Sequence, residues 1–343
     1  MNKIHLETPA GITEILIKRN GLEDARKWIE VRHPGRRLAI ITDSNLNGHY
    51  RERLAEVFRD AVIFVVAAGE DTKNPLEAVE LIKKLEKDGF DRGDVVTGFG
   101  GGMVTDLAGF VASTFKRGVH YTAIPTSLLA MADAAIGGKT GVNVGAKNDM
   151  GTFYPAEHAL LDAEFLKTLP ERELNSGMAE VIKYAATLDP SLAEDLMRDG
   201  LDFDTILQKS ARAKVSIVEQ DFKEAGLRQV LNFGHTFGHA IEAKSEYALL
   251  HGEAIGIGMI YANKVAQKLE KQAPETDQTI RRLLEKFGLP TELPEGMQLE
   301  DLMPYIIQDK KKSGEEISFI IAPEMGQYEI VKLTSQELLD LLK

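Results

Sequence analysis

The first half of the chain alternates short apolar runs with longer segments in which apolar residues recur every three or four positions. The short runs are rich in β-branched residues and predict strands at Arg37–Asp43, Ala61–Ala67, Asp94–Gly98 and Val119–Ile124. The longer segments predict helices at Leu46–Phe58 and Pro75–Lys87. This alternation is typical of parallel strands that are joined by right-handed crossovers in a doubly wound sheet.

After about Tyr154 the pattern becomes almost entirely helical. Helices are predicted at Glu173–Thr187, Ser191–Met197, Asp204–Glu219, Leu231–Ala243, Glu253–Leu269 and Glu275–Phe287. Two strand-like runs, Ile317–Pro323 and Gln327–Leu333, predict an isolated hairpin. We therefore expect an α/β N-terminal domain (residues 1–160) with a doubly wound, mostly parallel sheet. An all-α C-terminal domain, apart from that hairpin, is expected over residues 161–343.

The predicted strands end in polar or glycine-rich residues. These ends are Thr42–Asn45, Gly69–Lys73, Gly98–Gly102 and Pro125–Ser127. Doubly wound sheets bind their ligands at the carboxyl ends of the strands. The N-terminal domain is therefore predicted to bind a nucleotide at this edge of its sheet.

The glycine-rich run Gly98–Phe110 follows a predicted strand and opens a predicted helix. Glycines there let the backbone approach a pyrophosphate, whose charge is stabilised by the helix N-terminus. Met103 stands where the GxGxxG pattern has its last glycine, so a tight structural turn is the alternative. Asp43 ends an earlier strand and is a candidate for contacts with a ribose, with a helix cap as its alternative.

Three of the chain's eight histidines lie within the stretch Arg228–Glu253. His235 and His239 are four residues apart on a predicted helix, so they share one of its faces. His251 opens the next predicted helix and can point back at this pair. Neutral imidazoles from two helices, together with a carboxylate, are typical of a site for a first-row metal. The alternative is a hydrogen-bonded pair in the core.

The candidate carboxylate for this metal is Glu180. It lies three residues before Lys183, on one face of a predicted helix whose other positions are almost all apolar. A helix of this kind is buried, and buried charges are usually paired or coordinate a metal. The alternative is an ion pair at the surface.

A segment rich in glycine and alanine, Ile136–Asp149, carries Lys139, Lys147 and Asn148. It has too few apolar residues to be buried for packing, and its lysines suit a phosphate or a carboxylate. A flexible surface loop is the alternative. Asp133 lies six residues before Lys139, so the end of a helix could bring both into one cleft.

The composition narrows the class of ligand. The formal net charge of −12 argues against nucleic acid as a partner, because binding to phosphate backbones needs a basic surface. The chain has no cysteine, so a metal would be held by histidines and carboxylates. Neither a signal peptide nor a membrane-spanning run is expected, and a cytoplasmic enzyme is the default expectation.

Long motifs are distributed over most of the chain, from about Asp43 to Lys312. They read GGGMVTDLAGFVAS, FKRG, IPTSLLAMADAAIGGKTGVN, KNDMGTFYP, LKTLPERELNSGMAEVIKYA, GLRQVLNFGHTFGHAIE and LLHGEAIGIGM. Together they resemble the 3-dehydroquinate synthase family, whose sugar-phosphate cyclases share their fold with glycerol dehydrogenase-like polyol dehydrogenases. The resemblance implies that zinc or cobalt is bound by Glu180, His235 and His251, so that His239 contacts the substrate instead.

The resemblance also implies which residues bind the substrate and the cofactor. Catalytic roles would fall to Asp133, Lys139, Lys183, Glu224 and His239. Further substrate contacts would come from Arg117, Lys147, Asn148, Lys214, Arg228, Asn232 and Lys310 or Lys311. In a homodimer, Arg117 would reach the neighbouring site. The NAD contacts would involve Asp43, Asn45, Glu70, Lys73, Gly101, Gly102, Asp106, Thr126, Ser127, Lys139, Lys147, Thr168 and Leu169.

The chain departs from the family pattern at one turn. The family usually has NHPLGKN where this chain has NVGAKN, which is one residue shorter. Asp149 stands where an apolar residue is usual. A carboxylate beside Lys147 and Asn148 would weaken phosphate binding unless it points away.

The implied reaction belongs to the shikimate pathway and converts 3-deoxy-D-arabino-heptulosonate 7-phosphate into 3-dehydroquinate and phosphate. NAD would transiently oxidise the C5 hydroxyl, which acidifies the C6 proton before phosphate leaves; re-reduction, ring opening and aldol closure follow. Two alternatives remain. A different sugar-phosphate cyclase would not need Lys214, Arg228 and Asn232 for a substrate carboxylate. An NAD- and metal-dependent polyol dehydrogenase would not need the lysine-rich loop for a neutral substrate.

Overall fold

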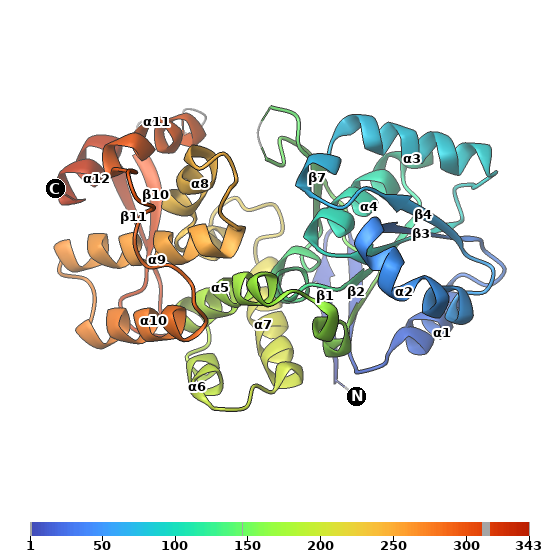
Figure 1. Ribbon diagram of the computed structural model, residues 1–343, viewed down its shortest axis with the longest axis horizontal. Helices are drawn as coiled ribbons and strands as arrows, with labels where there is room; N and C mark the ends of the chain where they lie inside the picture. Colours follow the sequence, from blue (N-terminus) through green and yellow to red (C-terminus); the bar gives the residue numbers. More distant parts are fainter. Residues whose placement is uncertain (1, 146, 311–315, 343) are drawn as a thin grey trace. The chain divides into compact units, whose positions relative to one another are not determined.

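The computed structural model describes residues 2–145, 147–310 and 316–342, and its chain can be followed in Figure 1. These residues form two compact units. Unit 1 comprises the residues up to Pro170 together with Phe203–Phe222, and unit 2 comprises Glu171–Asp202 and the residues from Lys223 onward. Within the described residues, no helix combines the length and the hydropathy that crossing a bilayer requires.

Unit 1 contains a seven-stranded sheet with the strand order β1-β2-β9-β6-β5-β3-β4. All neighbouring pairs are parallel except β1 with β2, which confirms the predicted doubly wound, mostly parallel sheet. The strands are β1 (Asn2–Thr8), β2 (Gly11–Ile17), β3 (Leu38–Asp43), β4 (Val62–Val66), β5 (Val95–Gly100), β6 (His120–Pro125) and β9 (His158–Leu161). The hairpin β1–β2 and strand β9 were not predicted.

The crossover helices of unit 1 create a switch point between the adjacent strands β3 and β5. From β3 the chain passes through α2 to β4 at one edge, whereas from β5 it passes through α4 to β6 in the opposite direction. In doubly wound sheets, ligands bind in the crevice at such a point. The helices of this layer are α1 (Leu22–Arg32), α2 (Ser44–Val57), α3 (Pro75–Lys87) and α4 (Gly102–Thr114).

The lysine-rich segment after β6 is partly a hairpin and not a loop throughout. Strands β7 (Lys139–Val142) and β8 (Met150–Phe153) pair antiparallel, and β7 packs on α4. Thr140, Gly141 and Val142 are buried by this contact, although Lys139 remains exposed. The expectation that this segment is not buried for packing is therefore wrong for β7, because a neighbouring apolar helix supplied the partner. Short helical turns complete the unit at η1 (Glu70–Thr72), η2 (Phe115–Arg117), η3 (Ala130–Ala134) and η4 (Ala163–Thr168).

Helix α7 (Phe203–Val218) returns to unit 1, although the expected boundary at residues 160/161 placed it in the second domain. It packs on β1 and β2, and Glu219, just after it, accepts a hydrogen bond from the backbone N–H of Glu7 at 3.0 Å. Periodicity identified this segment as a helix, but it carries no information about which distant element the helix contacts.

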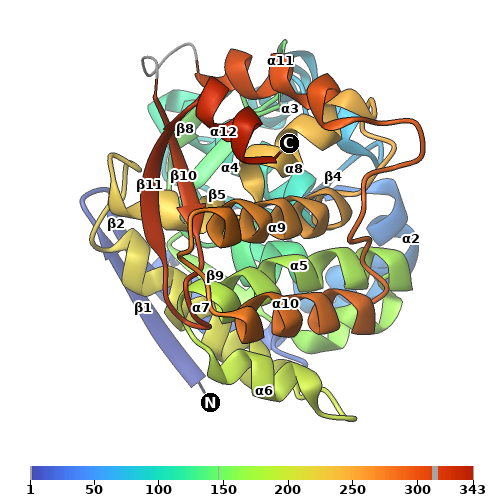
Figure 2. The same ribbon diagram turned by 90° about the vertical axis from the view of Figure 1, so that its left-hand side faces the viewer.

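Unit 2 is helical apart from the hairpin of β10 and β11, as predicted. Its central element is α9, which contacts α5, α8, α10 and α12 (Figure 2). The elements are α5 (Glu171–Thr187), α6 (Ser191–Met197), η5 (Leu227–Asn232), α8 (His235–Lys244), α9 (His251–Lys268), α10 (Pro274–Lys286), α11 (Leu299–Lys310), β10 (Glu316–Ile321), β11 (Glu329–Thr334) and α12 (Ser335–Leu342).

Helix α8 begins at His235, not at Leu231 or Asn232 as the apolar spacing suggested. Gly234, directly before it, has a φ of 80°, a left-handed conformation that ends η5 and redirects the chain. The carbonyl of Gly234 also contacts α9 so closely that a Cβ on Gly258 would lie 2.0 Å from its oxygen. The glycines of this stretch therefore serve backbone-to-backbone packing of α8 on α9.

Candidate functional site

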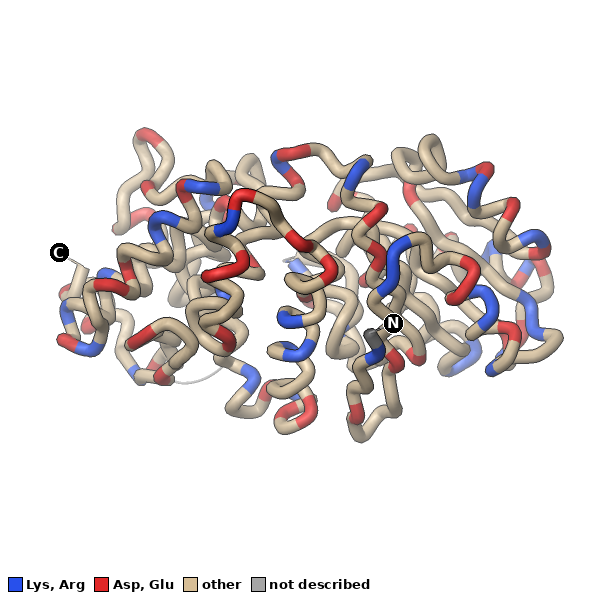
Figure 3. Tube along the Cα trace, turned by 90° about the horizontal axis from the view of Figure 1, so that it is seen from below, with Lys and Arg blue, Asp and Glu red and all other residues tan. Residues whose placement is uncertain are grey.

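Charged residues are interspersed along the chain, with Lys and Arg positions between Asp and Glu positions (Figure 3). The few Lys and Arg side chains that are buried help to locate candidate ligand sites. Among the described residues they are Lys73, Lys183, Lys214 and Arg228, each 5% exposed or less. All four belong to the residues expected to contact the cofactor or the substrate. A cation leaves water only where a partner compensates its charge, so these positions mark candidate ligand sites.

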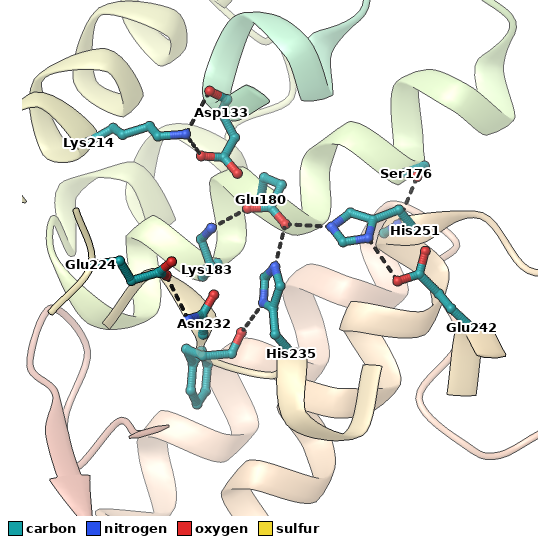
Figure 4. A network of polar contacts seen from close by, with 12 residues as sticks. Asp133, Ser176, Glu180, Lys183, Lys214, Glu224, Asn232, His235, Glu242 and His251 are labelled. Carbon is teal, nitrogen blue, oxygen red and sulfur yellow. Dashed lines mark hydrogen bonds and ion pairs between the residues drawn. The ribbon is translucent and has the colours of Figure 1, made fainter. Parts of the chain in front are cut away.

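In unit 2, Glu180 on α5 meets the first residues of two helices, His235 of α8 and His251 of α9 (Figure 4). Glu180 Oε1 lies 3.2 Å from His251 Nε2 and 3.5 Å from His235 Nε2. The three ligand atoms all lie within 4.8 Å of one another, and Glu180 is fully buried. The structure therefore brings together the set that the family resemblance implied.

The chemical state of these side chains suits a metal. Burial lowers the pKa of His235 to about 3, so its imidazole is neutral at physiological pH. Its Nδ1–H donates to the carbonyl of Phe233 at 3.1 Å, which leaves the Nε2 lone pair facing Glu180. Lys183 donates to Glu180 Oε2, the oxygen that faces away from the imidazoles. The carboxylate is thereby held with Oε1 directed at both histidines.

Glu242 is a functional candidate that the sequence analysis missed. It is 3% exposed, and its Oε2 lies 3.1 Å from Nδ1 of His251. A carboxylate in this position fixes the tautomer of a metal-binding histidine and orients its ring. The signal was present in the sequence, because Glu242 follows His235 by seven residues and His239 by three on one helical face.

His239 does not belong to the buried set of Glu180, His235 and His251, although helical spacing alone favoured His235 and His239 as a pair of ligands. Its side chain is exposed, and its ring centroid lies 5.1 Å from that of His235. A second possible set is formed by His239, Glu242 and His251. The set around Glu180 fits a metal better, because two Nε2 atoms face the same carboxylate oxygen while Glu242 already accepts from Nδ1 of His251.

The first turn of α9 is anchored tightly on α5, which positions His251. The backbone N–H of Gly252 donates to the Ser176 hydroxyl at 2.9 Å, and a Cβ on Gly252 would lie 1.8 Å from the Ser176 carbonyl oxygen. Glu253 accepts from the N–H of Leu250 at 2.8 Å and from Arg172 of α5 at 2.7 Å. Only glycine at position 252 allows this contact.

Arg228 lies in η5 and is 1% exposed, so the alternative that it is a surface residue is wrong. In the same turn, Asn232 donates from Nδ2 to Glu224 Oε1 at 3.0 Å. Glu224 adopts a φ of 60°. Three of the expected substrate and catalytic residues of unit 2 therefore lie in one short segment that also leads to His235.

In unit 1, Lys214 on α7 pairs with Asp133 of η3. Lys214 Nζ donates to the Asp133 carbonyl at 2.7 Å and to its carboxylate. That Lys214 and Arg228 together bind a substrate carboxylate stays a prediction; within unit 1, Lys214 has the carboxylate of Asp133 beside it. Lys139 at the start of β7 is exposed, and Lys147 is half-buried.

The expected nucleotide residues of unit 1 converge on Lys73. Its Nζ lies 2.9 Å from Glu70 and 3.1 Å from Asp106, and it donates to Asn148 Oδ1 at 2.8 Å. Burial alone would lower the pKa of Lys73, but the carboxylates of Asp106 and Glu70 outweigh it and raise that pKa, so the ammonium stays charged. Asn148, expected at the substrate, is therefore held beside these residues.

Asp43 and the glycine turn flank the switch point between β3 and β5. Asp43 caps α2 by accepting from the N–H groups of Asn45 and Leu46 at 2.8 and 3.0 Å, so its alternative role as a helix cap is confirmed. Gly101 precedes α4 and provides no side-chain cap, which leaves the N–H groups of the first turn of α4 without a capping side chain.

The remaining expected positions are placed as follows. The Thr168 hydroxyl lies 2.8 Å from Tyr50 of α2, Ser127 Oγ accepts from the N–H of Ala130 at 3.3 Å, and Thr126 is buried at the end of β6. Leu169 is half-buried, and Gly102 is the first residue of α4.

Arg117 is exposed with a φ of 67°, and Asp149 is exposed. Lys310 ends α11 but its side chain is not described, and Lys311 lies outside the described residues.

Family models match most of the chain. The 3-dehydroquinate synthase N-terminal model matches residues 63–176, and the C-terminal model matches residues 177–312. The 3-dehydroquinate synthase of Streptococcus suis (strain 05ZYH33) is 39% identical and covers 99% of both chains. The chain belongs to the 3-dehydroquinate synthase family. Another member, from Streptococcus thermophilus (strain CNRZ 1066), is 38% identical over 96% of each chain.

Solved structures show how widely the fold of this family is shared. ValA, the 2-epi-5-epi-valiolone synthase of Streptomyces hygroscopicus subsp. jinggangensis 5008, was solved with NAD⁺ and Zn²⁺ bound; its TM-score is 0.85 at 26% identity, with 96% and 95% of the chains covered. A 2-deoxy-scyllo-inosose synthase has a TM-score of 0.89 at 24% identity, with 99% of both chains covered. An iron-containing alcohol dehydrogenase from Thermococcus thioreducens has a TM-score of 0.66 at 14% identity, covering 96% and 97%. The fold therefore serves both cyclases and dehydrogenases, as expected.

Proposed function

We propose that this protein is a 3-dehydroquinate synthase, a phosphate-eliminating lyase that converts 3-deoxy-D-arabino-heptulosonate 7-phosphate into 3-dehydroquinate and phosphate. The observation that carries the proposal is the buried set of Glu180, His235 and His251 in a chain 39% identical over 99% of its length to a 3-dehydroquinate synthase. The buried Arg228 in the same unit supports it, because this substrate carries a carboxylate.

The donor atoms support a metal and a nucleotide as cofactors. Two imidazoles and one carboxylate suit zinc or cobalt, which would supply Lewis-acid chemistry at substrate hydroxyls. NAD would supply the reversible oxidation of one hydroxyl, and ValA is a relative that binds both NAD⁺ and Zn²⁺. Around the switch point, NAD would contact Asp43, Asn45, Glu70, Lys73, Gly101, Gly102, Asp106, Thr126, Ser127, Lys139, Lys147, Thr168 and Leu169.

The chain's own side chains would bind and orient the substrate. Arg228 would bind the carboxylate as a bidentate donor, because a guanidinium matches a carboxylate with two parallel N–H bonds. Lys139 and Lys147 would bind the phosphate, helped by Arg117 from the neighbouring subunit of a homodimer. Fixing both ends of the substrate restricts it to the conformation from which phosphate leaves.

Other expected residues would hold the reacting groups in place. Lys183 would keep Glu180 directed at the metal, since it donates to the opposite oxygen. Asn232 would hold Glu224 for contact with substrate hydroxyls. Further polar contacts with the substrate would come from Asp133, which is paired with Lys214, and from the exposed His239. Lys310 or Lys311 would provide a further cation.

The proposal is tested with purified protein, NAD, zinc and the heptulosonate 7-phosphate. We expect one phosphate released for each 3-dehydroquinate formed, with no net NADH, because the cofactor is reduced and then reoxidised within each turnover. NADH that accumulates in step with product would identify a dehydrogenase. Turnover of a hexose phosphate without a carboxylate, in place of the heptulosonate, would identify a different cyclase. The metal-depleted protein is the matched control and should release no phosphate.

A further inference from the structure

A second cluster of possible metal ligands lies in unit 1, at the amino-terminal edge of its parallel strands. His33 is the C-cap residue of α1, His120 is the first residue of β6, and Glu157 directly precedes β9. The backbone N–H of Glu157 donates to the Tyr121 carbonyl at 2.8 Å, which places Glu157 beside His120. The nucleotide residues lie at the carboxyl ends of the strands, so this cluster occupies the opposite edge of the same sheet.

The ligand atoms of this cluster lie at hydrogen-bond distances, slightly closer together than ligands around one ion. His33 Nε2 lies 2.9 Å from Glu157 Oε2, and His120 Nδ1 lies 2.6 Å from Glu157 Oε1. All three ligand atoms lie within 4.8 Å of one another. Two ligand atoms on one tetrahedral zinc ion are about 3.3 Å apart, since each bond measures about 2.0–2.1 Å. Small side-chain movements would therefore admit an ion.

The set around Glu180 provides an internal comparison. There too a carboxylate lies close to two imidazole nitrogens, at 3.2 and 3.5 Å, and in both sets the three ligand atoms lie within 4.8 Å of one another. They differ in exposure: the side chains of His120 and Glu157 are 37% and 38% exposed, whereas Glu180 is fully buried. The cluster in unit 1 is thus open to solvent, which gives an ion a path of entry and a water molecule for the remaining coordination position.

The two imidazoles of this cluster lie close together, which favours one shared ion over two separate positive charges. The rings of His33 and His120 are tilted by 36° with their centroids 3.9 Å apart, a spacing at which two positive charges would repel. His33 is 9% exposed, so its ring is largely shielded from solvent, whereas His120 and Glu157 leave one side of the cluster open. Imidazole nitrogens and a carboxylate are donors that suit zinc and related ions.

We propose that His33 Nε2, His120 Nδ1 and Glu157 bind a second divalent transition-metal ion, of the zinc class. This inference goes beyond the proposed function and does not depend on it, because these residues contact neither the nucleotide nor the substrate in that proposal. The competing interpretation is a hydrogen-bonded His–Glu–His cluster that only fastens the end of α1 to the sheet. The two interpretations differ in metal stoichiometry.

Stoichiometry is measured on the full-length protein after chelation, by titration with zinc and elemental analysis of the washed protein. We expect two zinc ions per chain in the wild type and one in His120→Gln. His251→Ala should also bind one, and the double variant none. Glu157→Gln keeps the size of the side chain and should lose the same ion as His120→Gln. A His120→Gln variant that binds as many ions as the wild type would overturn the proposal, whether that number is one or two.

The single tryptophan of the chain gives a local readout that needs no substrate. The ring of Trp28 lies 5.9 Å from that of His33, so Cu²⁺ bound at this site should quench its fluorescence. We expect saturable quenching in the wild type and in His251→Ala, and its loss in His120→Gln and Glu157→Gln. His49→Gln, which changes an exposed histidine of α2, is the matched control and should behave as the wild type. Equal quenching in His120→Gln and wild type would contradict the site, whatever the outcome of the activity assay.

Discussion

Glu242 acts through a metal ligand in our interpretation and does not contact the metal itself. Its carboxylate accepts from Nδ1 of His251, so Nε2 keeps the lone pair that a metal needs. Loss of such a partner typically lowers metal affinity about 10- to 100-fold. The role of Glu242 therefore depends on a contact between α8 and α9, which the sequence motif alone does not show.

The substitution Glu242→Gln should lower zinc affinity about 10-fold, at the small end of that range, because a neutral amide oxygen still accepts from Nδ1 but more weakly. Competition against a chelator of known affinity measures the change. Glu246→Gln alters an exposed carboxylate just after α8 and should leave the affinity unchanged. Equal affinities in Glu242→Gln and wild type would show that Glu242 does not orient His251.

Arg228 is the residue on which the choice between cyclases depends. Removing one partner of a desolvated charge pair costs about 2–5 kcal/mol, so Arg228→Ala should lose on the order of 30-fold or more in kcat/KM. Arg228→Lys should recover only part, because a point charge cannot reproduce a bidentate fork. Since Arg228 is buried, part of any loss could come from packing.

A substrate analogue without the carboxylate separates these two causes. A packing defect lowers kcat/KM for the analogue and for the true substrate alike. Loss of a carboxylate contact lowers kcat/KM for the true substrate far more than for the analogue. Equal losses for both would exclude Arg228 as the carboxylate ligand.

His158 links burial to the pH dependence of stability. It is 1% exposed on β9 beside Trp28, with ring centroids 4.8 Å apart, and burial lowers its pKa from 6.5 to about 4. Below pH 6.5 the unfolded chain binds a proton that the folded chain binds only near pH 4. The free energy of unfolding therefore has its full value above pH 6.5. It falls by about 3 kcal/mol as the pH falls from 6.5 to 4.

Urea unfolding followed by Trp28 fluorescence at pH 7 and pH 4 tests this link. The wild type should lose more free energy of unfolding between the two pH values than His158→Gln, by about 3 kcal/mol. The glutamine amide cannot take up a proton in this range. The variant therefore shows how stability changes with pH when His158 does not titrate. An identical pH dependence in the two proteins would show that His158 does not contribute.

At the scale of elements, the contact of α9 with α5 determines where His251 lies. A methyl group at Gly252 would lie 1.8 Å from the Ser176 carbonyl, and a carbonyl belongs to backbone that moves only with its helix. Gly252→Ala should therefore shift the first turn of α9 and destabilise unit 2 by about 1–3 kcal/mol or more. It should also weaken zinc binding at His251.

Thermal unfolding and zinc titration of Gly252→Ala measure these two effects. Gly48→Ala is the control, because a Cβ at Gly48 on α2 meets no atom within 4 Å. There alanine should raise stability by about 0.5–1 kcal/mol through its better helix propensity. Normal stability and zinc affinity in Gly252→Ala would show that close packing at Gly252 is not needed to position His251.

At the scale of the molecule, the metal set connects three helices of an already packed unit. Glu180, His235 and His251 come from α5, α8 and α9, and α9 also packs on α10 and α12. Removal of the metal should therefore abolish activity while leaving the helical circular dichroism nearly intact. Zinc or cobalt should then restore the rate. Loss of helical signal on chelation would instead show that the metal holds unit 2 together.

The periodicity of the sequence determined the type of most elements. Apolar residues at period 3.6 or in short β-branched runs can bury themselves only as helices or strands, so the doubly wound sheet and the helical second unit followed from it. Its motifs also indicated Glu180, His235 and His251. The start of α8 was placed too early, because the left-handed Gly234 interrupts a pattern that otherwise looks continuous.

Only the tertiary structure decided which elements meet. It returned α7 to unit 1, buried β7 on α4, paired Lys214 with Asp133 and placed Glu242 behind His251. It also brought His33, His120 and Glu157 together from positions up to 124 residues apart. Spacing along the chain predicts neighbours within one helix or strand. Contacts between distant elements depend on how apolar faces pack, and that information is distributed over the whole sequence.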